Sequence, residues 1–147
     1  MRSPLDDLDR CILTALARDA RVSWKDLATE AGVSAPTIRD RVKRLQDTGV
    51  IQSFAVEIAP AALGFSLEAV VRFRPLPGKR HVLEVQIQET DRIVQCDKVT
   101  GEDGFVVRIL LKEIGELDSL LETFSRMATT NTSIVKSSPV RMRPPPF

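Results

Sequence analysis

Two helix starts separated by a single glycine turn constrain the fold of this chain more than any other feature. Ser23 and Ser34 each precede an apolar repeat of helical spacing, and a serine hydroxyl can accept hydrogen bonds from the free N–H groups of a first helical turn. Gly32 lies between them, where a helix can end in the left-handed conformation that glycine adopts most easily. The pattern predicts a helix over about 24–31, a short turn, and another helix from about 35 to 48.

A further helix is expected immediately before this pair. Apolar residues recur there at steps of three and four, which is the spacing of one helical face. Aspartates stand at its start, where the helix dipole favours negative charge. The predicted helix covers about 6–18, and its apolar positions are Leu5, Leu8, Ile12, Leu13 and Leu16.

The helix that follows Gly32 has one apolar face and one basic face. Ile38, Val42 and Leu45 recur at helical spacing and predict a buried stripe. The formal net charge of the chain is only +1, so a phosphate-binding surface would have to concentrate its cations locally, as the segment 39–44 does with four cations and one anion. The side opposite the stripe carries Pro36, Arg39, Asp40, Lys43 and Asp47.

Two interpretations of these helices are open. They could form a helix-turn-helix whose second helix enters the major groove of double-stranded DNA, or an ordinary helical hairpin with a solvated charged face. Gly49, followed by loosely alternating residues over 50–58 that predict a short strand or β-hairpin wing, favours the first. On this hypothesis the residues nearest the bases are Ser34, Pro36, Thr37, Arg39, Asp40 and Lys43. The other members of the predicted DNA-binding set are Arg21, Trp24, Lys25, Arg41 and Arg44. The four cations among them are expected to lie near phosphates.

The second half of the chain alternates strand and helix patterns in the order βαββαβ, which is that of a ferredoxin-like sandwich. The fold class is therefore α+β. Strands are predicted over 65–73, 93–99, 105–111 and 132–142, and helices over about 79–90 and 117–127. The predicted domains are a winged helix-turn-helix at 1–59, a linker at 60–64, the ferredoxin-like domain at 65–142, and a loose tail at 143–147, where three prolines cannot continue a sheet.

The predicted sheet carries more apolar residues than one face needs. Because two helices cover only one face, we expect the other face to be apolar and to pack against a second copy of the chain. The residues that support this homodimer are Phe65, Leu67, Val70, Phe73, Val107, Ile109 and Leu111.

Other classes of protein are disfavoured. No apolar stretch approaches the roughly 20 residues of a membrane span, and Met1-Arg2-Ser3-Pro4 leads into acidic residues rather than a signal-peptide core, so we expect a soluble, cytoplasmic protein. Cys11 and Cys96, far apart among apolar residues, predict reduced core thiols, and the single histidine, His81, predicts a solvent-facing helix position. We expect no metal, no cofactor and no catalytic residues.

Short motifs along nearly the whole chain match the pattern of one known family. The matching stretches are Leu8-Asp9-Arg10-Cys11-Ile12-Leu13, Ala20-Arg21-Val22-Ser23, Leu27-Ala28, Gly32-Val33-Ser34, Thr37-Ile38, Arg41-Val42-Lys43-Arg44-Leu45, Gly49-Val50-Ile51, Leu63-Gly64, Val94-Gln95-Cys96 and Val99-Thr100-Gly101. In these stretches the chain resembles the Lrp/AsnC regulators, the leucine-responsive and asparagine-responsive type. The resemblance implies a transcription regulator with a winged helix-turn-helix and a ligand-sensing ferredoxin-like domain. It also implies a homodimer built through the second domain and often a ring of dimers, such as an octamer, with an amino acid bound between dimers.

One position departs from the pattern of this family. The family usually reads Thr-Gly-x-x-Asp-aromatic, and this chain reads Thr100-Gly101-Glu102-Asp103-Gly104-Phe105, so Gly104 stands where the carboxylate for an effector's ammonium group is expected. Glu102 or Asp103 could substitute, the ligand could lack an ammonium group, or the protein could be an architectural DNA-binding oligomer without a ligand. The stretch could also be only a β-hairpin turn, because Asp-Gly is a strong hairpin signal. We expect ligand binding to be retained weakly, with altered specificity.

Overall fold

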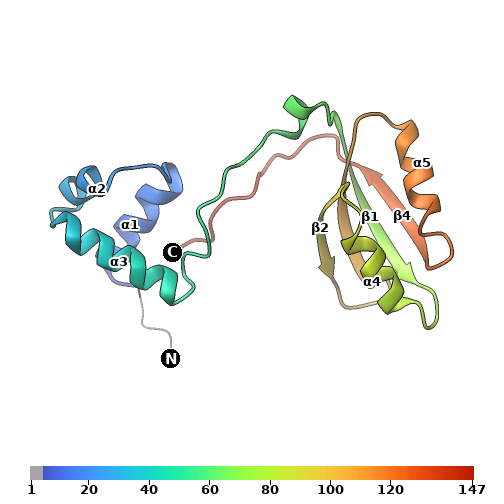
Figure 1. Cartoon of the computed structure of the whole chain (residues 1–147), viewed down its shortest axis with the longest axis horizontal. Helices are drawn as coiled ribbons and strands as arrows, with labels where there is room; N and C mark the ends of the chain where they lie inside the picture. The colour runs from blue at the N-terminus through green and yellow to red at the C-terminus, as the bar shows by residue number, and fades with distance from the viewer. Residues whose placement is uncertain (1–4) are drawn as a thin grey trace. The chain divides into compact units, whose positions relative to one another are not determined.

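The computed structural model describes residues 5–147, which form two compact units (Figure 1). The first contains the chain up to Glu57 together with Met142–Phe147, and the second contains Ile58–Arg141. Residues 1–4, on which the expectation about a signal peptide rests, lie outside the described residues. Within 5–147, none of the helices combines the length and the apolar character that a membrane crossing needs.

Three helices make up most of the first unit, and their bounds confirm the prediction from the sequence. Ser23 and Ser34 cap the second and third helices, each hydroxyl accepting from a backbone N–H of the first turn. Gly32 ends the second helix with φ +67°. Asp6 and Asp9 fix the start of the first helix, because each side chain accepts from the other residue's backbone N–H. The helices are α1 (Asp7–Arg18), α2 (Trp24–Ala31) and α3 (Ala35–Asp47).

One apolar core holds these helices together. The inner faces of all three meet in it, as the helical spacing in the sequence predicts. Each fully buried leucine or isoleucine stabilises the fold by about 1.5–3 kcal/mol relative to an exposed one, so the outward orientation of the polar face of α3 follows from the core. The buried members are Ile12, Ala15, Leu16, Leu27, Ala28, Ile38, Val42 and Leu45.

The segment 50–59 is extended but forms neither a strand nor a hairpin, so the prediction of a β-wing is wrong. Within residues 5–147, strand pairing joins only the strands of the second unit, and none of them pairs with this segment. A lone extended segment cannot satisfy its backbone groups as a sheet does. Two of its apolar side chains, Val56 and Ile58, are 86% and 63% exposed.

The second unit is an antiparallel sheet packed against two helices. The order of its elements confirms the predicted βαββαβ arrangement, and the strands lie in the order β2-β3-β1-β4 across the sheet (Figure 1). With the helical first unit, the fold class is α+β. After a short 3₁₀ turn at Pro60–Leu63, the elements are β1 (Leu67–Pro75), α4 (Arg80–Gln88), β2 (Ile93–Lys98), β3 (Phe105–Leu111), α5 (Gly115–Glu122) and β4 (Ala128–Ile134).

The last strand lies earlier in the chain than the sequence predicted. β4 spans Ala128–Ile134 instead of 132–142 and pairs with β1 in antiparallel register. Just beyond it, the N–H of Val135 donates to the carbonyl of Glu68 at 2.8 Å. Because β1 offers pairing partners only over its own length, the chain leaves the sheet after this bond.

Most apolar residues of the sheet gather on the face that α4 and α5 cover, so the outer face is mixed rather than wholly apolar as predicted. Alternate residues of β1 and β3 form one buried cluster with side chains from both helices, because two amphipathic helices need a whole apolar face. The outer face carries Arg72, Arg74 and an ion pair between Glu68 and Arg108, together with the partly buried Val70, Val106 and Leu110. Of the seven residues that supported the prediction, Leu67, Phe73, Val107, Ile109 and Leu111 belong to the covered side, Phe65 precedes β1, and Val70 alone alternates to the outer face.

The sequence also made predictions about the burial of the two cysteines, the exposure of the histidine and the order of the tail. Both cysteines are free thiols, but Cys96 is exposed on the edge strand β2 and is not a core residue, and Cys11 is only partly buried. His81 is exposed on α4, as predicted. The tail 143–147 forms no helix or strand and every residue in it is exposed, although its contacts group it with the first unit, where Phe147 lines an apolar groove.

Candidate nucleic-acid interface and effector turn

The outer face of α3 presents the side chains that the sequence placed nearest the bases. Ser34 caps the helix, and its hydroxyl lies 2.8 Å from that of Thr37. An exposed helix that begins with short polar groups and continues with basic ones suits the major groove, where base edges offer donors and acceptors. The exposed residues on the turns after Ser34 are Pro36, Arg39, Asp40 and Lys43.

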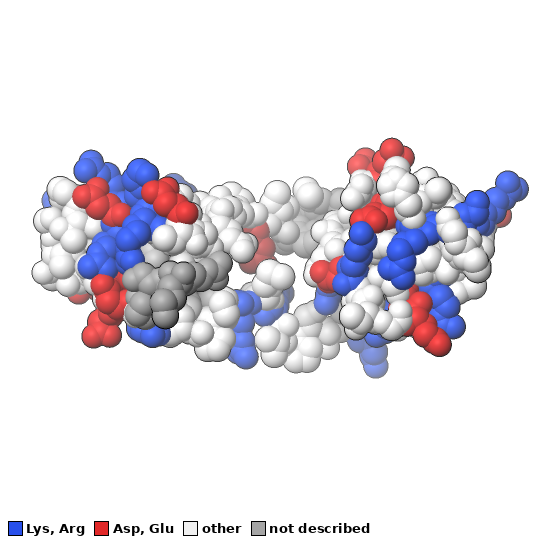
Figure 2. Space-filling model, turned by 90° about the horizontal axis from the view of Figure 1, so that it is seen from below, with Lys and Arg blue, Asp and Glu red and all other residues white. Residues whose placement is uncertain are grey.

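The cations on this face take part only in exposed ion pairs. Arg39 lies 3.4 Å from Asp40, and Lys43 lies 2.7 Å from Asp47, with all four side chains 62% to 72% exposed. The hydrogen bond to Asp47 raises the pKa of Lys43 above its ordinary value. Such exposed pairs contribute little to stability, and both cations can exchange a carboxylate for DNA. Figure 2 shows acidic and basic side chains interleaved over the first unit, at the left of the view.

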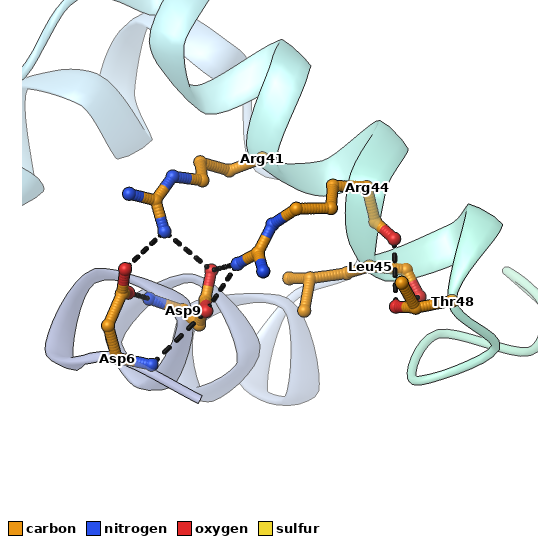
Figure 3. Close-up of polar contacts among 6 residues, drawn as sticks. All are labelled: Asp6, Asp9, Arg41, Arg44, Leu45 and Thr48. Atoms are coloured by element: carbon orange, nitrogen blue, oxygen red, sulfur yellow. Dashed lines mark hydrogen bonds and ion pairs between the residues drawn. The ribbon is translucent and has the colours of Figure 1, made fainter. Parts of the chain in front are cut away.

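Arg41 and Arg44, which the sequence placed near phosphates, point toward the start of α1 instead (Figure 3). Arg41 is hydrogen-bonded to Asp6 and lies 3.2 Å from Asp9. A guanidinium nitrogen of Arg44 lies 2.6 and 2.5 Å from the two carboxylate oxygens of Asp9. Both arginines therefore join α3 to α1. Their side chains are still 33% and 38% exposed, and their predicted phosphate contacts stay a prediction.

Asp9 is the buried centre of this ion-pair cluster, with a side chain only 1% exposed. Burial acts to raise the pKa of its carboxyl group. Hydrogen bonds from Arg44, from the backbone of Asp6 and from Arg41 more than offset this effect, and the pKa lies below its ordinary value. Sequence patterns did not reveal the cluster, because its two arginines follow Asp9 by 32 and 35 residues.

The remaining members of the predicted DNA-binding set lie around the start of α2. Arg21, Trp24 and Lys25 are all exposed. The backbone N–H of Arg21 donates to the side chain of Asp19 at 2.8 Å, which fixes the turn before the helix. The N-terminus of a helix attracts phosphate, so the exposed positions of the two cations are compatible with the predicted phosphate contacts.

The turn that was expected to hold an effector connects β2 to β3. Gly101 and Gly104 adopt φ values of +97° and +73°. The N–H of Val99 donates to the carbonyl of Gly104 at 3.0 Å and closes the hairpin. The stretch from Thr100 to Gly104 is therefore a β-hairpin turn, as one of the two interpretations predicted.

Both carboxylates of the turn face arginines of β1. Glu102 lies 2.6 Å from Arg74, and Asp103 lies 3.9 Å from both Arg72 and Arg74. The turn thus presents guanidinium groups and carboxylates together, which is the combination that a zwitterion requires. The two arginines were not among the residues expected at this site, although their alternate positions in a predicted strand place them on one face.

Gly104 has no room for a side chain. A Cβ atom at this position would lie 2.9 Å from Cδ of Pro75 and 3.1 Å from its Cγ, well inside the usual separation of about 3.5–4.0 Å between carbon atoms. Its positive φ also disfavours residues other than glycine. The proline at the end of β1 therefore leaves no space for the aspartate of the Thr-Gly-x-x-Asp pattern at this position.

Comparison with known families and proteins covers most of the chain. Residues 5–46 match the AsnC-type helix-turn-helix domain, and residues 68–145 match the Lrp/AsnC ligand binding domain. The chain is similar to the HTH-type transcriptional regulator LrpA of Mycobacterium tuberculosis, at 32% identity over 90% of this chain and 89% of the relative. It is also similar to the regulator FL11 of Pyrococcus furiosus, at 31% identity over 92% and 91% of the two chains.

Solved structures share both the helical unit and the βαββαβ unit. One is the feast or famine regulatory protein from M. tuberculosis complexed with L-methionine, with a TM-score of 0.86, 30% identity, and coverage of 96% of this chain and 98% of that one. Another is E. coli AsnC, with a TM-score of 0.85, 25% identity, and coverage of 95% and 97%. The relatives are transcription regulators and not enzymes. The chain belongs to the Lrp/AsnC family of DNA-binding transcription regulators.

Proposed function

We propose that the outer face of α3 reads the operator DNA of this regulator. The different positions of its cations carry the proposal: Arg39 and Lys43 are exposed and weakly paired, whereas Arg44 is tied to the buried Asp9. Phosphate contacts then fall mainly to Arg21 and Lys25 at the start of α2. The residues proposed to lie nearest the bases are Ser34, Pro36, Thr37, Arg39, Asp40 and Lys43.

Selection of bound duplexes from a random pool tests this proposal and identifies the operator sequence in the same experiment. The chain should enrich a defined sequence, because a helix in the major groove discriminates between base edges. Arg39→Ala should enrich a more degenerate sequence. The control Arg18→Ala removes an exposed cation of α1 that pairs with Glu30, and it should enrich the same sequence as the unchanged chain. An unchanged selection by Arg39→Ala would exclude the assigned role.

We further propose that the β2–β3 turn forms part of a site for an amino-acid effector. A relative that is 30% identical has been solved with L-methionine, and the charges at the turn of this chain suit a zwitterion. In the proposed site Arg72 and Arg74 bind the effector carboxylate, and Asp103 takes the ammonium group in the role that Gly104 cannot fill. The backbone at Gly101 permits close approach, and Thr100 and Glu102 complete the turn.

An architectural role without a ligand is the second candidate, and the pairing of both turn carboxylates with arginines favours it. Thermal unfolding with each L-amino acid separates the two, because a ligand that binds only the folded chain raises its stability. For an amino acid that binds, Asp103→Asn should weaken binding about tenfold or more, while the matching 2-oxo acid, which lacks the ammonium group, should bind both proteins equally. An unfolding temperature that none of the amino acids raises would support the architectural role.

We also propose a homodimer whose interface includes the extended segment 54–58. The outer sheet face mixes charged residues with Val70, Val106 and Leu110. The more exposed apolar surface is in the extended segment, where Phe54, Val56 and Ile58 expose 45%, 86% and 63% of their surface. Within residues 5–147, the backbone of this segment pairs with no strand. An exposed apolar segment with free backbone groups is suited to pairing with a second copy. A ring such as an octamer would need further contacts between dimers.

A further inference from the structure

An apolar groove of about 910 Å³ lies on the first unit, between α1 and the segment that follows α3. Leu13, Leu16 and Ala17 line it from α1, and Ile51 and Phe54 line it from the segment after α3. Leu16 also belongs to the buried core of the unit, so the groove reaches that core. Apolar surface of this kind is stabilised when another apolar group covers it.

The C-terminal end of the chain forms one wall of this groove. Pro144, Pro145 and Phe147 are among the residues that line it, and Met142–Phe147 belongs by its contacts to the first unit. Phe147 is 41% exposed, whereas Met142, outside the groove, is 94% exposed. Of these two apolar side chains, the one that lines the groove is therefore covered to the greater extent.

The composition of this segment suits docking. Three consecutive prolines, 144–146, hold the backbone in a restricted range of φ, so little conformational entropy is lost when the segment binds. Prolines also lack the backbone N–H, so covering them leaves no donor unpaired. Proline-rich segments dock in apolar grooves for these reasons.

We propose that residues 143–147 act as a strap that fastens the C-terminal end of the chain to its own DNA-binding domain. The chain leaves the first unit after Glu57 and returns to it at Met142, so the docked strap adds a second backbone connection between the two domains. A second connection reduces the freedom of the DNA-binding domain relative to the ligand-binding domain. Release of the strap restores this freedom and leaves both cores intact.

Hydrogen exchange of the full chain, followed by mass spectrometry, tests the strap. Phe147→Ser, and separately a chain that ends at Met142, should speed exchange of the amides of α1 and of 50–55 by about tenfold, because covered apolar surface and the local stability that it gives are lost. Met142→Ser, which changes a residue outside the groove, should leave exchange unchanged. The amides of β1 to β4 should exchange at the same rate in all variants.

Equal exchange of α1 and 50–55 in the unchanged chain and in Phe147→Ser would overturn the proposal. A photo-cross-linking residue in place of Phe147 distinguishes this chain's own groove from that of a second copy. When isotopically heavy and light chains are refolded together, links should join α1 and the tail of the same isotope. Links between heavy and light chains would show that the occupant comes from a second copy and would overturn the intrachain strap.

Discussion

Arg44 of α3 holds both carboxylate oxygens of Asp9 of α1, at 2.6 and 2.5 Å (Figure 3). The Asp9 side chain is 1% exposed and that of Arg44 is 38% exposed. A buried carboxylate in a helical domain of this size is tolerated only when it is paired. The contact therefore sets how α3 packs against α1.

Arg44→Ala should lower the free energy of unfolding of the chain by about 2 kcal/mol, because it leaves a buried carboxylate without its nearest partner. Partial exposure of Arg44 keeps the loss below that of a fully buried pair. Urea unfolding gives the value. Arg18→Ala, which breaks an exposed pair with Glu30, is the control and should change stability little. Equal losses in the two variants would show that burial of Asp9 has no energetic role.

The same cluster predicts loss of stability in acid. The pKa of Asp9 in the folded chain lies below its ordinary value of 3.8, and so does that of Asp6, chiefly because of the hydrogen bond from Arg41. A carboxyl group whose pKa is lowered by folding stabilises the folded chain at every pH above its ordinary pKa. This stabilisation is lost as the pH falls through the pKa of the folded chain. The stability difference between the unchanged chain and Asp9→Asn should therefore be full at neutral pH and shrink below about pH 4. A difference that is independent of pH would contradict this account.

Gly104→Asp, which restores the residue usual in the family, should destabilise the second unit by about 2 kcal/mol, since it combines positive φ with a contact against Pro75. Gly101→Asp isolates the backbone contribution, because Gly101 also has positive φ but nothing within 4 Å of its Cβ position. The cost at Gly104 should be the larger, and Pro75→Ala should reduce it in a double-mutant cycle. Equal costs at the two glycines would remove the steric explanation.

Sedimentation at micromolar concentration should show a dimer that dissociates in Val56→Asp or Ile58→Asp. Charges introduced in an apolar contact must be desolvated, which weakens association. Ile114→Asp is the matched control, because Ile114 is 58% exposed and lies outside the segment 54–58. The proposed interface would be contradicted if the unchanged chain sedimented as a monomer. It would also be contradicted if neither Val56→Asp nor Ile58→Asp weakened the dimer.

The parts of the fold set by local chemistry could be predicted from the sequence. Ser23, Gly32 and Ser34 define the ends of α2 and α3 through hydrogen bonds within one turn, and the spacing of Ile38 and Val42 gives the buried face of α3. These features depend only on residues close together in the chain. The same reasoning correctly predicted that Arg39 and Lys43 are exposed.

Features that depend on distant partners could not be predicted. Asp9 looked like an ordinary first-turn aspartate, because Arg44 lies 35 residues away. The apolar residues of β1 and β3 were divided between two faces, because the area that α4 and α5 cover is not visible in strand patterns. Pro75 leaves no room for a side chain at Gly104 because the register of β1 and β3 brings these two residues together.

The most direct test of the central claim is the affinity of Arg39→Ala for the selected operator and for a scrambled duplex at the same salt concentration. If the outer face of α3 reads bases, operator affinity should fall by the equivalent of about 1–3 kcal/mol, and affinity for the scrambled duplex should change much less. Lys25→Ala, a cation placed near phosphate, should weaken both duplexes alike and flatten the salt dependence. Unchanged operator affinity in Arg39→Ala, or an equal loss on both duplexes, would contradict the account.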